Sequence, residues 1–456
     1  MKRACLSRSR ALPVALVLGI WLTPLAAGAQ QSPSPAPPFP SASPGAGQVL
    51  TLQEALKIAL ETQPTIQSRL ADYAAAQQRV KEALSNILPQ LGGNWVGSRQ
   101  QTQFFSSSIG GGTTKPQPLW STTQAAQLTL SQILFDFGQT FAATDVAKAQ
   151  AEVSRLDAEV QKDQIILAVK EGYFNLLLGK RLVVVNREAV ARAELNLRSA
   201  KGFFEVGTRP KIDVVRAEVT MANAELGLIQ ARNAVSLARV ALNTAMGIAV
   251  NTPTEVEDIL SYEPYPVDQD KLIPEALRQR PEYLRVNMVV TSAEASVRQA
   301  FRNFFPVIQG TGAYGGTFRS PTTPDDLAET WQLGVQLTWT IVDGGNKIAR
   351  YQETQKILES GRSQVKTIEL AVSQEVVTAD LNLNEAKERI NPSQKGVEAA
   401  KENFRLAKGR FDAGVGTIID LTDAQFTLTQ SEATLAQTLA DYRIGIARLE
   451  RALGRR

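Results

Sequence analysis

An internal repeat constrains the fold of this 456-residue chain more than any other feature of its sequence. The segment ELNLRSAKGFFEVG at 194–207 recurs as KENFRLAKGRFDAG at 401–414. The same offset pairs Asp136 with Asp343 and continues without a gap to Gly247 and Gly454. One inserted residue would rotate the rest of a helix by about 100°. A gapless repeat of this length therefore predicts two copies that are built on rigid helices.

The hydrophobic pattern within each copy is that of a coiled coil. Val146, Val153, Val160 and Leu167 recur every seven residues, and no proline interrupts 138–206. A helix of this length would span about 100 Å, so we expect an elongated molecule. The predicted elements are long helices over 138–206 and 345–413, each followed by a return helix, over 210–246 and 417–453.

Shorter segments between the helices alternate between apolar and polar residues. In WQLGVQLTWTIVD at 331–343, every second residue is apolar, and Gln, Gly or Thr stands between. A period of two predicts a strand with one apolar and one polar face. We expect four such strands, over about 90–103, 124–136, 306–318 and 330–343.

Alternating segments of about ten residues with aromatic ends are typical of strands that cross a membrane. We expect the apolar faces to contact lipid and the Gln- and Thr-rich faces to line a water-filled lumen. A half-buried sheet packed on the helices is the alternative, and is common in soluble proteins. The residues expected at the lipid face and in its aromatic belt are Trp95, Trp120, Tyr314, Phe318, Trp331, Leu333, Val335, Leu337 and Trp339.

The ends of the two copies are marked by changes in composition. A basic start, a mostly apolar run at 11–27 and small residues at 27–29 predict a signal peptide over 1–29. The Pro- and Ser-rich segment 30–49 is predicted to be a disordered leader. The first structural repeat then covers 50–247 and the second covers 272–454. Residues 248–271 are predicted to form an equatorial linker between them.

Composition argues against several classes of function. The chain has no histidine, and Cys5 lies in the predicted signal peptide, so catalysis or metal binding by these residue types is not expected. The net charge of +4 resides in the predicted signal peptide as well, so no nucleic-acid partner is expected. The glycine-rich segments lack phosphate-loop spacing. We therefore predict a protein that is not an enzyme and holds no cofactor and no metal.

The duplicated order of short helices, strand pair, long helix and return helix resembles the TolC-like outer membrane efflux proteins, or outer membrane factors. The most specific stretch is FDAGVGTIIDLTDAQ at 411–425, echoed by FEVGTRPKIDVVRAE at 204–218. The resemblance implies a mixed fold, in which three chains form a 12-stranded transmembrane β-barrel in outer membrane lipid and a periplasmic α-helical barrel.

The function that this resemblance implies is a passive outer membrane exit duct of a tripartite efflux pump or a type I secretion system. The duct would be a homotrimer that works with a periplasmic adaptor (membrane fusion) protein and an inner-membrane pump. The alternative is a periplasmic coiled-coil adaptor or interaction protein without a membrane barrel. The uncharged alternation in all four strands favours the duct.

The resemblance also assigns roles to residues at the far ends of the helices. Asp420 and Asp423 would ring a closed periplasmic mouth, although Thr417 and Asp420 also have the spacing of a helix-capping box. Gly416 stands where the family has a locking arginine, and Arg209 is a possible replacement. The full set implied for this gate is Asp213, Arg209, Phe411, Thr417, Asp420 and Asp423.

Two further assignments concern the turns themselves. Gly207-Thr208 and Gly414-Val415 would form tips that dock the adaptor, and glycine there also suits a helix C-cap. Hydrophobic packing at the helix turn is the simpler explanation for Phe411 and Phe204.

Overall fold

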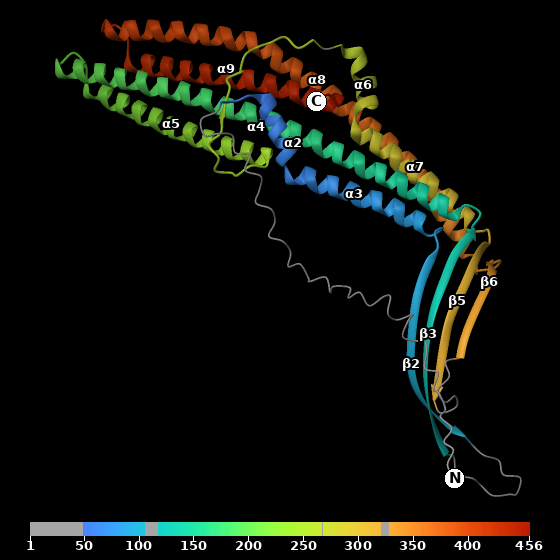
Figure 1. Cartoon of the computed structure of the whole chain (residues 1–456). Helices are drawn as coiled ribbons and strands as arrows, with labels where there is room; N and C mark the ends of the chain where they lie inside the picture. The colour runs from blue at the N-terminus through green and yellow to red at the C-terminus, as the bar shows by residue number, and fades with distance from the viewer. Residues whose placement is uncertain (1–48, 105–116, 267, 321–327) are drawn as a thin grey trace, which may run out of the picture.

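The computed structural model describes residues 49–104, 117–266, 268–320 and 328–456. The predicted signal peptide, almost all of the predicted leader and the Gly/Ser/Thr-rich loop of the first copy lie outside the described residues. A long body of helices occupies one end of the molecule, and four strands leave the other end at an angle (Figure 1).

The two repeats have the same order of elements. The first repeat contains β1 (Val49–Leu50), α2 (Leu52–Thr62), α3 (Pro64–Ser85), β2 (Gln90–Phe104), β3 (Gln117–Phe135), α4 (Gln139–Glu205) and α5 (Lys211–Met246). The linker holds β4 (Glu255–Val256) and the short helix η1 (Gln269–Lys271). The second repeat contains α6 (Leu272–Gln279), α7 (Pro281–Arg302), β5 (Val307–Ser320), β6 (Ala328–Thr338), α8 (Asn346–Asp412) and α9 (Ile418–Leu453).

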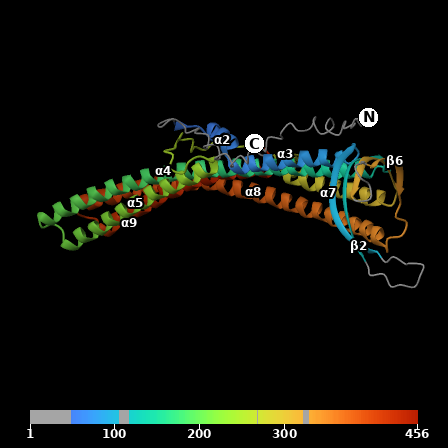
Figure 2. The same cartoon turned by 60° about the horizontal axis from the view of Figure 1, so that its bottom comes forward.

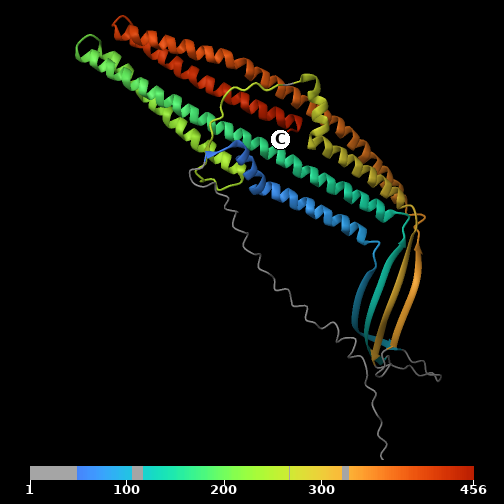
Figure 3. The same ribbon diagram turned by 45° about the horizontal axis from the view of Figure 1, so that its top comes forward.

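The helices form a layer that is four helices wide along the length of the body. In the half that ends in the two turns, α5, α4, α9 and α8 lie side by side in that order (Figure 1), and Figure 2 shows the same helices from another side. In the half near the strands, α3, α4, α7 and α8 take these places (Figure 3). Helices α4 and α8, of 67 residues each, run through both halves. None of the helices in the described ranges is both long and apolar enough to span a membrane.

Helices α5 and α3 meet end to end at the middle of the body. Gly247 ends α5 with a φ of +73°, and a Cβ there would lie 2.8 Å from the Cα of Gln63. The Gln63 Nε2 donates hydrogen bonds to the carbonyls of Thr244 and Ala245 in the last turn of α5, where carbonyls lack partners within the helix. Gly454, with a φ of +78°, joins α9 to α7 in the same way. The return helices therefore continue into the short helices across a tight backbone contact.

The main hydrophobic core lies at this midpoint and includes a small sheet that the sequence did not predict. β1 pairs in parallel with β4, although position 49 was predicted to be part of a disordered leader. Tyr173 from α4 is fully buried beneath this pair and donates hydrogen bonds to the carbonyls of Leu50 and Glu257. Burial raises the pKa of Tyr173 to about 12. The start of the first repeat is thus fastened to the linker.

The larger sheet has the order β2-β3-β5-β6 with every neighbouring pair antiparallel. Each strand is joined to one helix, and these helices lie side by side in the same order as the strands. β2 follows α3, β3 leads into α4, β5 follows α7 and β6 leads into α8. β3 begins at 117, earlier than predicted, and β6 ends at Thr338 rather than at 343. The ladder stops because β5 begins only after Pro306, which has no N–H to donate.

Candidate functional site

One face of the large sheet is apolar across all four strands. Side chains of directly paired residues in an antiparallel sheet lie on the same face. Leu128 pairs with Tyr314, and Tyr314 with Trp331, so these side chains share a face. Trp331 and Leu333 are 79% and 80% exposed in the single chain. By the same register, this face also carries Trp95, Trp120, Phe318, Val335 and Leu337. Their contact with lipid stays a prediction.

Charge on the apolar face is confined to the half farther from the helices. Among the described residues of the sheet, Arg99 and Glu329 are the charged residues that share this face by register. The Arg99 guanidinium lies over the Trp120 ring, 4.9 Å from its centroid. An arginine packed on an indole suits the boundary between an apolar band and water.

A cluster of aromatic side chains surrounds the junction between the strands and the helices. Phe137 has a φ of +53° and stacks on Phe305 with ring centroids 5.4 Å apart. Trp339 lies beyond the end of β6, and its Nε1 donates a hydrogen bond to the carbonyl of Phe304. Sequence reasoning found only Trp339, because the other members, apart from Phe135, lie outside the alternating segments. The cluster consists of Phe135, Phe137, Phe301, Phe304, Phe305, Trp339 and Tyr351.

Two repeat-related aspartates start the long helices at this junction. The Asp136 carboxylate accepts hydrogen bonds from the amides of Gly138 and Thr140, at 2.9 and 2.7 Å. Burial alone would raise the pKa of Asp136, but these hydrogen bonds outweigh it and hold the pKa below its usual range. Asp343 caps α8 by the same pair of contacts, two and four residues further on. Each aspartate lies between a strand and a long helix and fixes the first turn of that helix.

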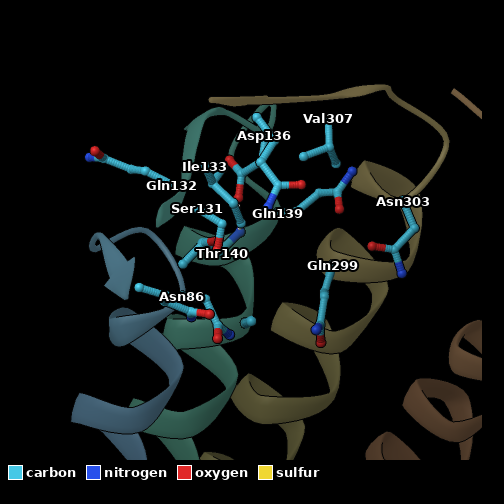
Figure 4. A pocket seen from close by; sticks show the side chains of 13 residues that line it. Asn86, Ser131, Gln132, Ile133, Asp136, Gln139, Thr140, Gln299, Asn303 and Val307 are labelled. Atoms are coloured by element: carbon cyan, nitrogen blue, oxygen red, sulfur yellow. Dashed lines mark hydrogen bonds between the residues drawn. The ribbon is translucent and has the colours of Figure 1, made fainter. Parts of the chain in front are cut away.

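A polar cavity of about 300 Å³ opens at the same junction. It is lined by residues of the polar face of the sheet, among them Gln90, Ser131 and Gln309, and by the ends of α3, α4 and α7. Figure 4 shows Asn86, Gln139, Gln299 and Asn303 around a common space, whereas the Gln132 side chain points away from it. Asn86 and Asn303 follow α3 and α7 at equivalent positions of the two repeats. Sequence reasoning missed this cavity, since it depends on how the two repeats pack.

The two turns at the opposite end of the body have the same backbone geometry. Gly207 has a φ of +73°, and the amide of Thr208 bonds to the carbonyl of Phe203. Gly414, with a φ of +79°, and Val415 repeat this arrangement, which is a Schellman C-cap. The Val415 side chain is 72% exposed. With Val206 71% exposed at the first turn, each tip presents a hydrogen-bonded turn with accessible apolar surface.

Arg209 connects the first turn to the second within one chain. Its Nη2 donates to the carbonyls of Gly416, at 2.8 Å, and Phe411, at 3.3 Å. Its guanidinium lies 4.6 Å from the centroid of the Phe411 ring, and its Nη1 lies 3.7 Å from an oxygen of the buried Asp213. A Cβ on Gly416 would lie 2.9 Å from the Phe411 nitrogen, so no larger residue fits there without a shift. We call this set of four residues the Arg209 clasp.

Hydrophobic packing beneath the clasp involves Phe411 but not Phe204. Phe411 is fully buried against Ile418 and against the ring of Phe203, with ring centroids 5.8 Å apart. Phe204 is 43% exposed. The predicted packing is therefore wrong for Phe204 within this chain, because its neighbour Phe203 occupies the inward position.

The remaining gate candidates lie at the start of α9. Thr417 and Asp420 form a reciprocal capping box, in which the Asp420 amide donates to the Thr417 hydroxyl and the Thr417 amide donates to the Asp420 carboxylate. Hydrogen bonds from the Thr417 side chain and backbone hold the pKa of Asp420 below its usual range. Asp423 lies one turn further along and is exposed. No group of three acidic or cysteine side chains in the described residues is arranged to hold a metal ion.

Comparison with known proteins agrees with this architecture. The sequence profile of the outer membrane efflux protein family matches residues 55–248 and 272–455, one match for each repeat. The chain is 24% identical to outer membrane protein TolC of Escherichia coli over 427 residues, which cover 89% of this chain and 83% of TolC. It is 25% identical to nodulation protein T of Rhizobium leguminosarum bv. trifolii, over 84% of this chain and 80% of that protein.

The fold is also that of a solved channel structure. The open state of the MtrE outer membrane channel of Neisseria gonorrhoeae superimposes with a TM-score of 0.74 at 21% identity, over 89% of each chain. The match of the family profile to both halves of the chain, together with the duplicated hairpins and strands, shows that this protein belongs to the outer membrane efflux protein family.

Proposed function

We propose that three copies of this chain form a passive exit duct across the outer membrane, gated at its periplasmic end. The single observation that carries this proposal is the apolar face that continues in register across all four strands of the large sheet. As a member of the outer membrane efflux protein family, the protein resides in the outer membrane, and its helices extend into the periplasm. The duct would serve a tripartite efflux pump or a type I secretion system.

The edges of the sheet support closure by further copies. Within the described residues, β2 and β6 each pair on one side only, so both edges expose unpaired N–H and C=O groups. Such groups are not tolerated in a membrane. Pairing β6 of one copy with β2 of the next removes both edges. Three copies would give twelve strands, an even number in the usual range for barrels.

The edge helix α5 supports the same closure. Its exposed side chains include Ile212, Val219 and Leu226, which are spaced by seven residues and are 52%, 57% and 53% exposed. An exposed apolar seam with this spacing is typical of a helix that packs against another helix. A neighbouring copy would cover it.

The gate would lie at the tips. Asp420 and Asp423 from three chains would form a ring of six carboxylates, which would favour cations over anions. Asp213, Thr417 and Phe411 would hold this mouth closed, with Arg209 in place of the arginine missing at position 416. The clasp described above supports this role for Arg209, because it joins the two hairpins of a chain.

The tips would also be the site of contact with a periplasmic adaptor protein, which would link the duct to an inner-membrane pump. Gly207, Thr208, Gly414 and Val415 form rigid and accessible turns, as docking requires. The alternative function, a soluble coiled-coil adaptor, is disfavoured because such a protein would expose Trp331 and its apolar neighbours to water.

Reconstitution of the purified protein into planar bilayers tests the proposal. We expect discrete cation-selective conductance steps, and a larger conductance when Asp420 and Asp423 are both replaced by Ala. A Thr427→Ala variant, one turn beyond Asp423 on α9, serves as a matched control and should conduct as the wild type does. Detergent-free solubility of the mature protein in periplasmic extract, or absence of conductance in all three proteins, would refute the duct.

A further inference from the structure

The cavity at the junction of strands and helices is polar, and its one ionisable side chain is already hydrogen-bonded. Asp136 is the only ionisable residue among those that line it, and both of its carboxylate oxygens accept hydrogen bonds from α4 amides. The other polar groups are mostly side-chain amides, contributed by both repeats. The six amides that line it, apart from Gln132, are Asn86, Gln90, Gln139, Gln299, Asn303 and Gln309.

Most of these amides have unused hydrogen-bonding capacity. Gln139 is held in place, since its Nε2 donates to the carbonyls of Arg302 and Phe305. Within the described residues, Asn86, Gln299 and Asn303 make no side-chain hydrogen bond, and the same holds for Gln90 and Gln309. Each amide offers two donors and an acceptor with two lone pairs. The cavity therefore presents a dense set of neutral donors and acceptors to whatever enters it.

The cavity lies on the path of cargo if the duct forms as proposed. Its strand residues Gln90, Ser131 and Gln309 belong to the polar face of the sheet, opposite the apolar face. Figure 4 shows that Asn86 from the first repeat and Asn303 from the second face the same space. Three chains would place three such cavities around the lumen at one height.

We propose that this amide-lined cavity is a weak binding site for neutral polyhydroxylated solutes of the saccharide class during their passage through the duct. Hydroxyl groups both donate and accept hydrogen bonds, and so match amides. An anionic solute would find no counter-charge, a cationic one would meet only the Asp136 carboxylate, whose oxygens already accept amide hydrogen bonds, and an apolar one would leave the amides unpaired. Ile133 and Val307 add a small apolar patch suited to the C–H face of a sugar ring. Weak binding suits a duct, because a solute must also leave. The inference rests on the proposed function.

Binding can be measured on the full-length protein in detergent, without any membrane. Saturation-transfer NMR with raffinose, a neutral trisaccharide, should show saturable binding with a dissociation constant in the millimolar range. Gln299→Leu should raise that constant about fivefold, the effect of losing one hydrogen bond of about 1 kcal/mol. Gln332→Leu is the matched control, because Gln332 lies on the polar face of β6 outside the cavity. It should leave binding unchanged.

The outcomes separate this site from the duct itself. Absence of saturable binding to the wild-type protein, or an equal loss in the Gln332→Leu variant, would overturn the proposal. If Gln299→Leu fails to assemble, Asn303→Ala takes its place and should weaken binding by a similar factor. A protein that binds raffinose but does not conduct ions would refute the proposed duct and support the binding site. Protein that conducts but does not bind would refute the site alone.

Discussion

Replacement of Arg209 by alanine tests whether one partly buried side chain holds the two helical turns of a chain together. The change removes two hydrogen bonds from a charged donor to the carbonyls of Gly416 and Phe411, each worth about 1.5–3 kcal/mol at most. It removes a cation–π contact worth about 1–2 kcal/mol and leaves Asp213 without its counter-charge.

These contributions to stability overlap, and two features of the structure make the total loss of stability smaller than their sum. The bond to Phe411 and the ion pair with Asp213 are long, at 3.3 and 3.7 Å. Asp213 also lies in the first turn of α5, where the helix dipole favours a carboxylate. We therefore expect the local stability of the tips to fall by about 2–4 kcal/mol, with the rest of the protein unchanged.

Hydrogen exchange at the turns measures this loss directly, because exchange reports local opening. Protection of the Thr208 and Val415 amides should fall roughly 30- to 700-fold, the equivalent of 2–4 kcal/mol. Arg198→Ala is the matched control, since among the described residues Arg198 makes only an exposed ion pair with Glu194 on the same helix. Protection in the Arg209→Ala protein within threefold of this control would refute the clasp.

Three other predictions follow from single positions. Gly247→Ala should lower the free energy of unfolding by more than about 1 kcal/mol, because the φ of Gly247 is +73°. Gly202→Ala, in open space on α4, should instead raise the free energy of unfolding by about 0.5–1 kcal/mol. Thermal unfolding of the two variants measures both changes. The pKa of Asp420 is lower in the folded protein than in the unfolded chain, so its ionised carboxylate stabilises the start of α9 at pH values above the unfolded pKa. Amide protection at the start of α9 should therefore be lost as the pH falls below about 4. Asp420→Asn should abolish this pH dependence. Leu333→Arg should cost about 2–4 kcal/mol in lipid and deplete the protein from outer membrane fractions, whereas Gln332→Arg, on the polar face, should not.

The parts of the fold that could be predicted from the sequence are those with a strong local signal. The long helix expected over 138–206 lies at Gln139–Glu205, because a heptad pattern sets its length and Asp136 caps its first turn. The two faces of the sheet follow from the period of two, which holds whatever the register between strands is. The capping box of Thr417 and Asp420 needs only a spacing of three residues.

The parts that could not be predicted depend on contacts between distant segments. β6 ends opposite the residue at which its antiparallel partner β5 begins, and nothing in WQLGVQLTWTIVD marks that point. Phe203 and Phe204 are adjacent and chemically identical, so only the rotation of α4 decides which one packs on Phe411. Arg209 could be proposed as a replacement for the missing arginine, but its bond to the carbonyl of Gly416 requires the folded positions of both turns.

The one-to-one continuation of strands into helices sets a geometric demand on the trimeric duct proposed above. Twelve strands spaced by about 4.8 Å and tilted by about 40° have a perimeter of roughly 75 Å. Twelve helices spaced by about 9–10 Å have a perimeter of roughly 110–120 Å. With equal numbers of elements on both sides, the backbone ring must therefore widen by about half over the few residues that separate β3 from α4 and β6 from α8. In that trimer the aromatic cluster would lie where the ring widens, and the amide-lined cavity would be the hollow that the change in circumference leaves behind.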